Sequence, residues 1–222
     1  MNFLYVDKDL SDELELSTKE YRHIFKVRRI KKGERLNIRN LRDDFLYTYT
    51  IETIDKKNAL LKLEDKRVLK IEPKKPLHVS WCVVDPKTIE KTLPFLNEFG
   101  VSKISFVYCD FSQKNFKIDL ERLKRILINS SQQCGRSSLM EIEIVNSLKE
   151  LIDRYPDIKI IDFGGKNLTC KEKFDSFLVG CEGGFSKAER EIFKNNQIVG
   201  LDFPTILRSE SAVLYVTSAI LS

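Results

Sequence analysis

The first third of the chain alternates apolar and polar positions over short stretches, which is the pattern of β-strands with one buried face. Residues 47–51 (YTYTI) show the alternation most clearly, and Lys56-Lys57-Asn58 predicts a hairpin turn. One helical turn is expected at 18–25. The strands are expected at 3–6, 35–39, 45–54 and 59–63. Together they predict a small antiparallel barrel.

The rest of the chain has a different pattern, in which continuous apolar runs alternate with longer amphipathic stretches. Unbroken apolar strands between helices are typical of a mainly parallel sheet with both faces covered. The strands are expected at 77–84, 104–108, 143–145, 158–163, 177–179 and 198–201. The helices are expected at 88–99, 119–133, 147–155, 187–195 and 209–221. This order predicts a doubly wound α/β domain.

Residues 71–76 (IEPKKP) lie between the two patterns and place two prolines among charged residues, as a linker does. We therefore expect a small domain at 1–70 and a larger one at 77–222. A chain of 222 residues with 42% hydrophobic content can form both cores. It has no apolar run of about 18 residues and no basic-then-apolar start. We expect a soluble, cytoplasmic protein that does not enter a membrane.

The net charge of +5 is concentrated near the N-terminus, because residues 1–70 carry 17 Lys or Arg against 13 Asp or Glu. A dense basic group begins at Arg22 and suits an anionic polymer such as RNA. If the helical turn continues, the spacing of Arg22, Lys26 and Arg29 places them on one face. The alternative is an ordinary solvated surface. The candidate RNA-binding residues are Arg22, Lys26, Arg28 and Arg29.

The cysteines and histidines argue against a disulfide framework and against a metal site. The chain has five cysteines, an odd number, far apart in the sequence and without a C-x-x-C pair. It has only two histidines, His23 and His78, which are too few for a multi-histidine metal centre. We expect reduced thiols and no bound metal.

A glycine-rich loop, Gly180-Cys181-Glu182-Gly183-Gly184, follows the apolar run at 177–179. Glycine lets backbone approach a ligand closely or take a positive φ. The next residues, Ser186-Lys187-Ala188-Glu189, have the form of a capping box and predict a helix start at Lys187. The loop is therefore held between a strand and a helix. An ordinary strand-to-helix turn is the alternative to a binding loop.

A second loop, 202–208, leads into the last apolar helix and ends with Arg208, two residues before Glu210. Charged residues at the start of so apolar a helix need an explanation. A surface salt bridge between the two is the alternative to a functional role. No G-x-G-x-x-G and no Walker A sequence is present, which leaves a Rossmann or P-loop site without support.

Four stretches in order give the chain a resemblance to a known family. GCEGGFS at 180–186 and ILRSESA at 206–212 resemble the GPEGGFS and ILRTETA sequences of the RsmE family, SPOUT-superfamily enzymes that methylate N3 of a uridine in 16S ribosomal RNA. NEFGV at 97–101 resembles the family's ELGV, and QCGR at 133–136 its EQxxR. Cys181 stands where the family usually has Pro, and the segment before Ile206 lacks the usual LGxR.

The resemblance implies a trefoil-knotted sheet, a rare exception to the rule against knots, with a PUA-like RNA-binding barrel at the N-terminus. Three loops at strand ends, 162–165, 180–184 and 202–208, would hold S-adenosylmethionine (AdoMet) in a bent form. The residues expected to bind this cofactor are Phe163, Gly180, Glu182, Gly183, Gly184, Leu201, Ile206 and Leu207.

Methylation of uracil N3 requires a site that orients the base and helps to remove or tolerate the N3 proton. Arg208 is the first candidate, because a fixed cation would stabilise negative charge on the imide. Glu210 would position Arg208 or assist with the proton, or be a helix N-terminal acid favoured by the dipole. Arg136 belongs by resemblance to the RNA-facing or subunit-facing side, the alternative being a helix C-terminal cation.

The resemblance further implies a homodimer, and the last helix has too many apolar residues for one buried stripe. The expected partners are 16S ribosomal RNA or the small ribosomal subunit, and a second copy of the chain. Methylation of another RNA site stays open. A non-catalytic RNA-binding adaptor would explain the basic barrel but not the glycine loops. A small-molecule α/β enzyme would explain the glycine loops but not the basic barrel.

Overall fold

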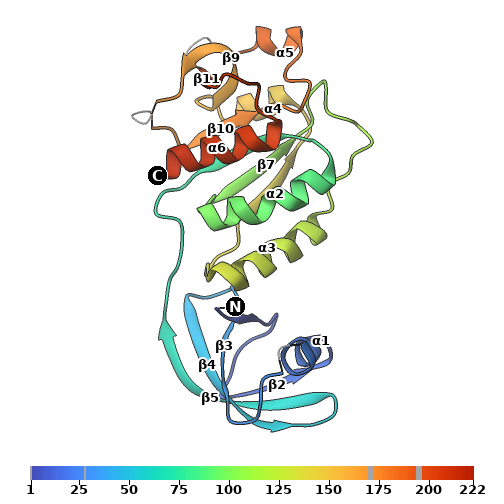
Figure 1. The fold of residues 1–222 in the computed structure, drawn as a ribbon, viewed down its shortest axis with the longest axis vertical. Coiled ribbons are helices and arrows are strands. Elements are labelled where there is room, and N and C mark those ends of the chain that lie inside the picture. The colour runs from blue at the N-terminus through green and yellow to red at the C-terminus, as the bar shows by residue number, and fades with distance from the viewer. Residues whose placement is uncertain (1, 28, 170–172, 194–196) are drawn as a thin grey trace. The chain divides into compact units, whose positions relative to one another are not determined.

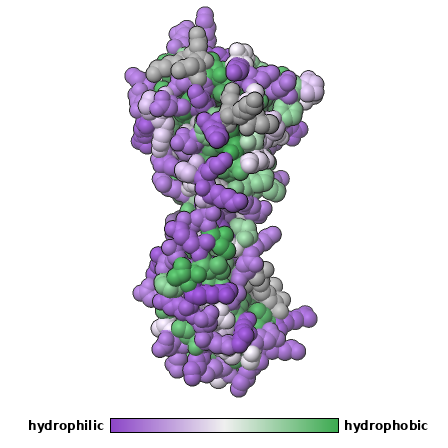
Figure 2. Space-filling model, turned by 90° about the vertical axis from the view of Figure 1, so that its left-hand side faces the viewer, coloured by the Kyte–Doolittle hydropathy of each residue, from purple (hydrophilic) through white to green (hydrophobic). Residues whose placement is uncertain are grey.

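The computed structural model describes residues 2–27, 29–169, 173–193 and 197–222 (Figure 1). The chain divides into two compact units. The first contains the residues up to Glu72 together with Ile128–Leu139, and the second contains Pro73–Leu127 and Met140–Ser222. On the face drawn in Figure 2, hydrophilic residues cover most of the surface and apolar residues form small groups, as expected for a chain with 32% charged residues.

The first unit is built on a curled sheet of five strands in the order β1-β3-β4-β5-β2. Only β1 and β3 pair in parallel. The predicted hairpin turn is confirmed, since the Asp55 N–H donates to the Asn58 carbonyl at 2.9 Å. The strands are β1 (Leu4–Tyr5), β2 (Glu13–Ser17), β3 (Arg35–Arg39), β4 (Phe45–Ile54) and β5 (Asn58–Val68). Strand β2 was not predicted from the sequence, although its residues alternate between exposed and buried.

The predicted helical turn of the first unit changes its winding halfway. Helix α1 (Thr18–Tyr21) continues as a π-helix, η1 (Arg22–Val27), whose turn is wider than that of an α-helix. Arg29 lies beyond it with a left-handed φ of 57°. The condition under which Arg22, Lys26 and Arg29 would share one face, an α-helix that continues to Arg29, is therefore not met. Arg28 lies outside the described residues.

The second unit is built on a six-stranded sheet in which every pair is parallel, in the order β11-β9-β10-β6-β7-β8. Its large side chains Trp81, Phe106 and Phe177 are fully buried, as expected where helices cover a parallel sheet. The strands are β6 (His78–Cys82), β7 (Lys103–Val107), β8 (Glu141–Val145), β9 (Lys159–Asn167), β10 (Ser176–Val179) and β11 (Ile198–Gly200). The predicted fold class, a mainly parallel α/β domain with a small N-terminal barrel, is confirmed.

The helices after the first unit follow the predicted pattern with one exception. They are α2 (Pro86–Phe99), α3 (Leu120–Cys134), α4 (Leu148–Arg154), α5 (Lys187–Glu191) and α6 (Ser209–Leu221). Helix α5 ends four residues before the predicted end at Asn195, and Asn195 itself lies outside the described residues. Helices α2 and α6 lie side by side (Figure 1).

The end of α3 belongs to the first unit, although the division drawn from the sequence placed everything after residue 76 in one domain. The reason is a set of hydrogen bonds to the start of the chain. The Asn2 N–H donates to the Gln132 carbonyl at 2.9 Å, and the Tyr5 N–H donates to the Gln132 side chain at 2.8 Å. Such contacts join distant parts of the sequence and leave no local pattern.

Strand β9 does not end at Phe163, as predicted, but continues to Asn167 through a large bulge. Its partner β11 pairs Ile198 with Ile160 and the next residue, Val199, with Lys166, so the residues between are unopposed. Gly165 lets the two backbones approach, because a Cβ there would lie 2.6 Å from the Ile198 carbonyl oxygen. The stretch 162–165 is thus a bulge within a strand rather than a loop after one.

Candidate functional site

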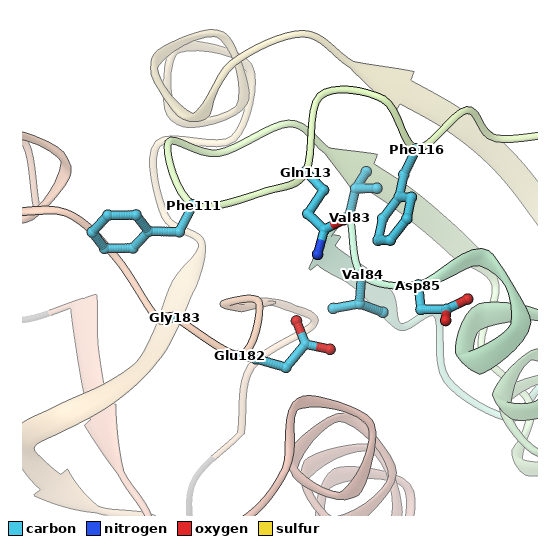
Figure 3. A pocket seen from close by; sticks show the side chains of 8 residues that line it. All are labelled: Val83, Val84, Asp85, Phe111, Gln113, Phe116, Glu182 and Gly183. Atoms are coloured by element: carbon cyan, nitrogen blue, oxygen red, sulfur yellow. The ribbon is translucent and has the colours of Figure 1, made fainter.

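Segments from three neighbouring strands meet at the carboxyl edge of the parallel sheet. They follow β6, β7 and β10, which are adjacent in the sheet, and such edges are where α/β folds bind ligands. Together they enclose a cavity of about 320 Å³ (Figure 3). It is lined by Val83, Val84, Asp85, Phe111, Gln113, Phe116, Glu182 and Gly183.

The glycine loop after β10 folds into a tight turn that requires its glycines. The Gly184 N–H donates to the Cys181 carbonyl at 2.9 Å, and Gly184 has a left-handed φ of 67°. Gly183 lies against the Phe111 side chain, since a Cβ there would be 3.0 Å from the Phe111 Cβ. A larger residue at position 183 would push the loop away from the cavity wall.

The predicted capping box is confirmed and does more than start α5. The Ser186 side chain accepts from the Glu189 N–H at 3.1 Å, and the Glu189 carboxylate accepts from the Ser186 N–H at 2.9 Å. The other Glu189 oxygen accepts from the Asp110 N–H at 2.9 Å. Burial raises the pKa of Glu189, while these two N–H donors oppose the shift. Glu189 therefore ties the segment after β7 to the glycine loop.

A second tie joins α5 to the β9 bulge. Arg190 donates to both carboxylate oxygens of Asp162, at 2.7 and 3.1 Å, and this contact raises the pKa of Arg190. The Asp162 side chain is only 6% exposed. The next residue, Phe163, is 71% exposed, so the tie holds an uncovered aromatic ring at the sheet edge.

Ser209 links the start of α6 to the glycine loop. Its buried hydroxyl donates to the Gly180 carbonyl at 2.5 Å and accepts from the Trp81 indole N–H at 2.7 Å. The chain thus returns from the edge strand β11 to the centre of the sheet before α6 begins. This return brings the 202–208 segment beside Gly180.

Arg208 is the N-cap residue of α6, is exposed and makes no capping hydrogen bond with its side chain. Among the described residues no ion pair joins it to Glu210, so the predicted positioning contact and its alternative, a surface salt bridge, are both absent there. Glu210 is half-buried in the first turn of α6. The guanidinium of Arg208 is left facing solvent beside the loop.

The remaining predicted cofactor residues surround the same loops. Ile206 is 81% exposed, which is unusual for so apolar a side chain, and Leu201 and Leu207 are half-buried. Exposed apolar side chains beside glycine backbone form a surface suited to a nucleoside, so these residues fit AdoMet. In the described part of the chain, no group of His, Cys, Asp and Glu side chains is arranged to hold a metal ion.

Three cysteines that are far apart in the sequence meet at the carboxyl ends of β6, β7 and β10, a contact that was not predicted from the sequence. Cys109 Sγ lies 3.7 Å from Cys181 Sγ and 3.1 Å from the Ser112 hydroxyl. Hydrogen bonds from Cys181 and Cys82 lower the pKa of Cys109, and burial raises that of Cys82. All three are free thiols, as is Cys134, while Cys170 lies outside the described residues.

Arg136, predicted near the site, belongs to the first unit and is buried there. Its Nε atom donates to the Ser138 hydroxyl at 3.4 Å. Burial lowers the pKa of its guanidinium, and the nearby charge of Glu72 opposes the shift. The role of Arg136 in the site stays a prediction.

The basic residues of the first unit that the structure describes are exposed at and after η1. Arg22, Lys26 and Arg29 all reach solvent, and none of these side chains forms an ion pair with another described residue. The Lys26 Nζ lies 6.0 Å from the centre of the Tyr21 ring. Three cations without acidic partners are free to contact phosphates.

Comparison with known families matches both units. Residues 71–221 match the RNA methyltransferase domain, and residues 16–64 match the RNA methyltransferase PUA domain. A relative from Helicobacter pylori strain 26695, named ribosomal RNA small subunit methyltransferase E, is 45% identical over 98% of both chains. One of the same name from Aquifex aeolicus is 28% identical over the full length of both chains.

Solved structures share the fold. A putative methyltransferase from Legionella pneumophila, in complex with the bound cofactor SAM, has a TM-score of 0.80 at 24% identity and covers 98% of this chain and 95% of its own. A ribosomal RNA small subunit methyltransferase E from Neisseria gonorrhoeae, bound to S-adenosyl methionine, has a TM-score of 0.80 at 21% identity and covers 99% and 96%.

Proposed function

This chain belongs to the RNA methyltransferase family, and we propose that it methylates N3 of a uridine in 16S ribosomal RNA of the small subunit. It is an AdoMet-dependent methyltransferase of ribosomal RNA. The proposal concerns the atom that is methylated, N3 of a uridine. The observation that supports a single site is the Ser209 hydroxyl, which bonds both Gly180 and Trp81 and so fixes Arg208 next to the glycine loop.

AdoMet would be held at the carboxyl edge of β9, β10 and β11, largely by backbone. When bound, it supplies a methyl group on a sulfonium centre. The loop backbone at Gly180 and Glu182 to Gly184 would orient it, and the exposed side chains of Phe163 and Ile206 would cover its apolar surface. Leu201 and Leu207 complete the proposed set.

Arg208 would stabilise the negative charge that develops when the uracil imide loses its proton. Its free guanidinium and its place at the start of α6 support this role. Glu210, in the first turn of α6, would assist with the N3 proton. For Arg136 we propose a contact with RNA or with a second subunit.

The first unit, with residues 1–70 as its main part, would supply RNA affinity through Arg22, Lys26, Arg28 and Arg29, and residues 77–222 would supply the chemistry across the 71–76 linker. No described helix combines the length and the apolar character that crossing a bilayer requires. We propose a cytoplasmic location, where ribosomal RNA is found.

We also propose a homodimer. Val213 and Val216 of α6 are fully buried within the chain, so the apolar surface that remains is smaller than the sequence suggested. It still includes Tyr215, 39% exposed and packed on Phe203 at 4.7 Å, and Phe95 of the neighbouring helix α2, 51% exposed. Sedimentation at micromolar concentration tests the dimer, and a monomeric mass would contradict it.

Methyl transfer from labelled AdoMet tests the function. The acceptors would be assembled small subunits, free 16S RNA, transfer RNA and a mixture of free nucleosides, and digestion with mass spectrometry would identify the product. We expect N3-methyluridine in 16S RNA. Transfer only to free nucleosides would favour a small-molecule enzyme, and RNA binding without AdoMet binding would favour an adaptor.

A further inference from the structure

The cavity at the carboxyl edge of β6, β7 and β10 has two polar side chains without a hydrogen-bond partner in the part of the chain that the structure describes. Gln113 and Glu182 point into the same space from opposite walls (Figure 3). Both are exposed, and neither side chain hydrogen-bonds to another described residue. Asp85, also on the wall, is already engaged, because it caps α2 by accepting from the Lys87 N–H at 2.7 Å.

The rest of the lining is apolar and partly aromatic. Phe116 and Val84 border the space that Gln113 and Glu182 face (Figure 3), and Phe111, 53% exposed, packs against Gly183. A volume of about 320 Å³ is at the lower end for small-molecule pockets and admits one nucleobase. Bases turned out of a strand are held by aromatic contacts and by hydrogen bonds to their edges.

We propose that this cavity is the acceptor-base site, in which Gln113 and Glu182 select a uracil that has been turned out of the RNA strand. The inference rests on the proposed function. A uracil edge presents a carbonyl, the N3–H and a second carbonyl. The Gln113 amide N–H would donate to one carbonyl, and the Glu182 carboxylate would accept the N3–H.

The same pair rejects cytosine. Cytosine has no proton on N3, so the Glu182 carboxylate would face a lone pair instead of a donor. A site built to hydrogen-bond a group discriminates strongly against an analogue that lacks it, because its own polar atoms are then left unpaired. Specificity for uracil thus follows from the position of Glu182.

The position of Glu182 also gives the N3 proton a destination. The carboxylate takes the proton from N3, the N3 lone pair forms the bond to the methyl carbon, and the donor sulfur keeps the electron pair of the bond that breaks. Glu182 then releases its proton to water. The backbone of residue 182 stays with the cofactor loop while its side chain serves the acceptor, which places the two substrates on either side of one residue.

Two variants test the site, with a matched control on the same segment. Gln113→Ala should lower kcat/KM for small-subunit RNA by about 10-fold, the value of one hydrogen bond, with an unchanged Kd for AdoMet by calorimetry. Asn115→Ala removes an exposed amide two residues away that does not line the cavity, and it should have no effect. Equal kcat/KM for wild type and Gln113→Ala would overturn the proposal.

Glu182→Gln tests the proton transfer. It should lower kcat by about 100-fold, as for loss of a general base, and the loss should shrink as pH rises because the imide then ionises without help. A loss that is constant with pH would overturn this role. Binding of uridine and cytidine monophosphates to wild type, measured by NMR saturation transfer, provides a test without turnover, with uridine expected to bind and cytidine not.

The results of these experiments distinguish a failure of the proposed function from a failure of the acceptor-base site. If the wild-type chain methylates no RNA, the proposed function fails and the acceptor site fails with it. If the wild type is active while Gln113→Ala and Glu182→Gln are both fully active, the function stands and only the acceptor site is wrong.

Discussion

The two edges of the parallel sheet come from the same strands but use their polar groups in opposite ways. At the amino edge, Lys103 forms ion pairs with Glu141 and Glu143, at 2.9 and 3.0 Å, and Ser105 donates to Glu143 at 2.5 Å. At the carboxyl edge, Arg208 and Glu182 have no such partner among the described residues. Lys103, Glu141 and Glu143 pair with one another and stabilise the first edge, whereas Arg208 and Glu182 at the second edge remain available for a substrate.

The strongest test of this contrast is Arg208→Ala. If the free guanidinium stabilises developing charge, its loss should lower methyl transfer by about 100-fold or more, roughly 2.7 kcal/mol, while AdoMet binding is retained. Arg154→Ala is the control at the amino edge, where Arg154 contacts Glu143 and Glu150, and its turnover should be normal. Near-normal turnover of Arg208→Ala would exclude the Arg208 side chain from the chemistry.

The amino edge should instead show a pH-dependent stability. Burial lowers the pKa of His78 to about 4, with Lys103 acting in the same direction and Glu143 opposing it. Because this value is below the ordinary 6.5, the unfolded chain binds the proton more tightly. The contribution of neutral His78 to the free energy of unfolding is therefore fully present above pH 6.5. It is lost as the pH falls from 6.5 toward 4.

His78→Gln should therefore remove part of the pH dependence of unfolding. Between pH 7 and pH 5, wild type should lose roughly 2 kcal/mol relative to the variant. Urea unfolding of both proteins at the two pH values measures the difference, and methyl transfer at pH 7 serves as the functional control. A constant gap between the two proteins would show that His78 titrates normally.

A smaller effect is expected for the shape of the glycine loop. Gly183→Val would place its Cβ 3.0 Å from the Phe111 side chain, so the loop must move and AdoMet binding should weaken by about 10-fold or more. Phe111→Ala in the same chain removes the clash and should restore part of the affinity. An unchanged Kd in folded Gly183→Val would exclude the loop from the cofactor site.

The parts of the site that depend on neighbouring residues could be predicted from the sequence. The strand before the glycine loop, the capping box of Ser186 and Glu189 and the start of α6 were predictable because each depends on neighbours within a few residues. The hydrogen bonds from Trp81 to Ser209 and from Asp110 to Glu189 join residues far apart in the chain. No local pattern marks such contacts.

One local prediction failed, and one meeting of side chains was not predicted, for the same reason. Asp162 to Gly165 resembled the end of a strand because glycines usually interrupt strands. Their purpose is the close approach of β9 to β11, which only the folded sheet reveals. The meeting of Cys82, Cys109 and Cys181 was equally hidden, because it depends on the order in which β6, β7 and β10 pair.

The smallest effect per residue should come from the basic group of the first unit, where each side chain is one contact among many. Replacing Arg22, Lys26 and Arg29 by Ala should weaken RNA binding and lower its salt slope by about 2 to 3 units, since each phosphate contact releases somewhat less than one counterion. AdoMet affinity should not change.

The matched control replaces Lys56, Lys57 and Lys62 by Ala. These side chains are also exposed, and their replacement lowers the net charge of the chain by the same amount. If both triple variants lose the same slope, the effect is one of total charge, and the basic group is only a solvated surface. If only the first variant does, the contacts are local to η1 and to Arg29. RNA binding at two salt concentrations decides between them.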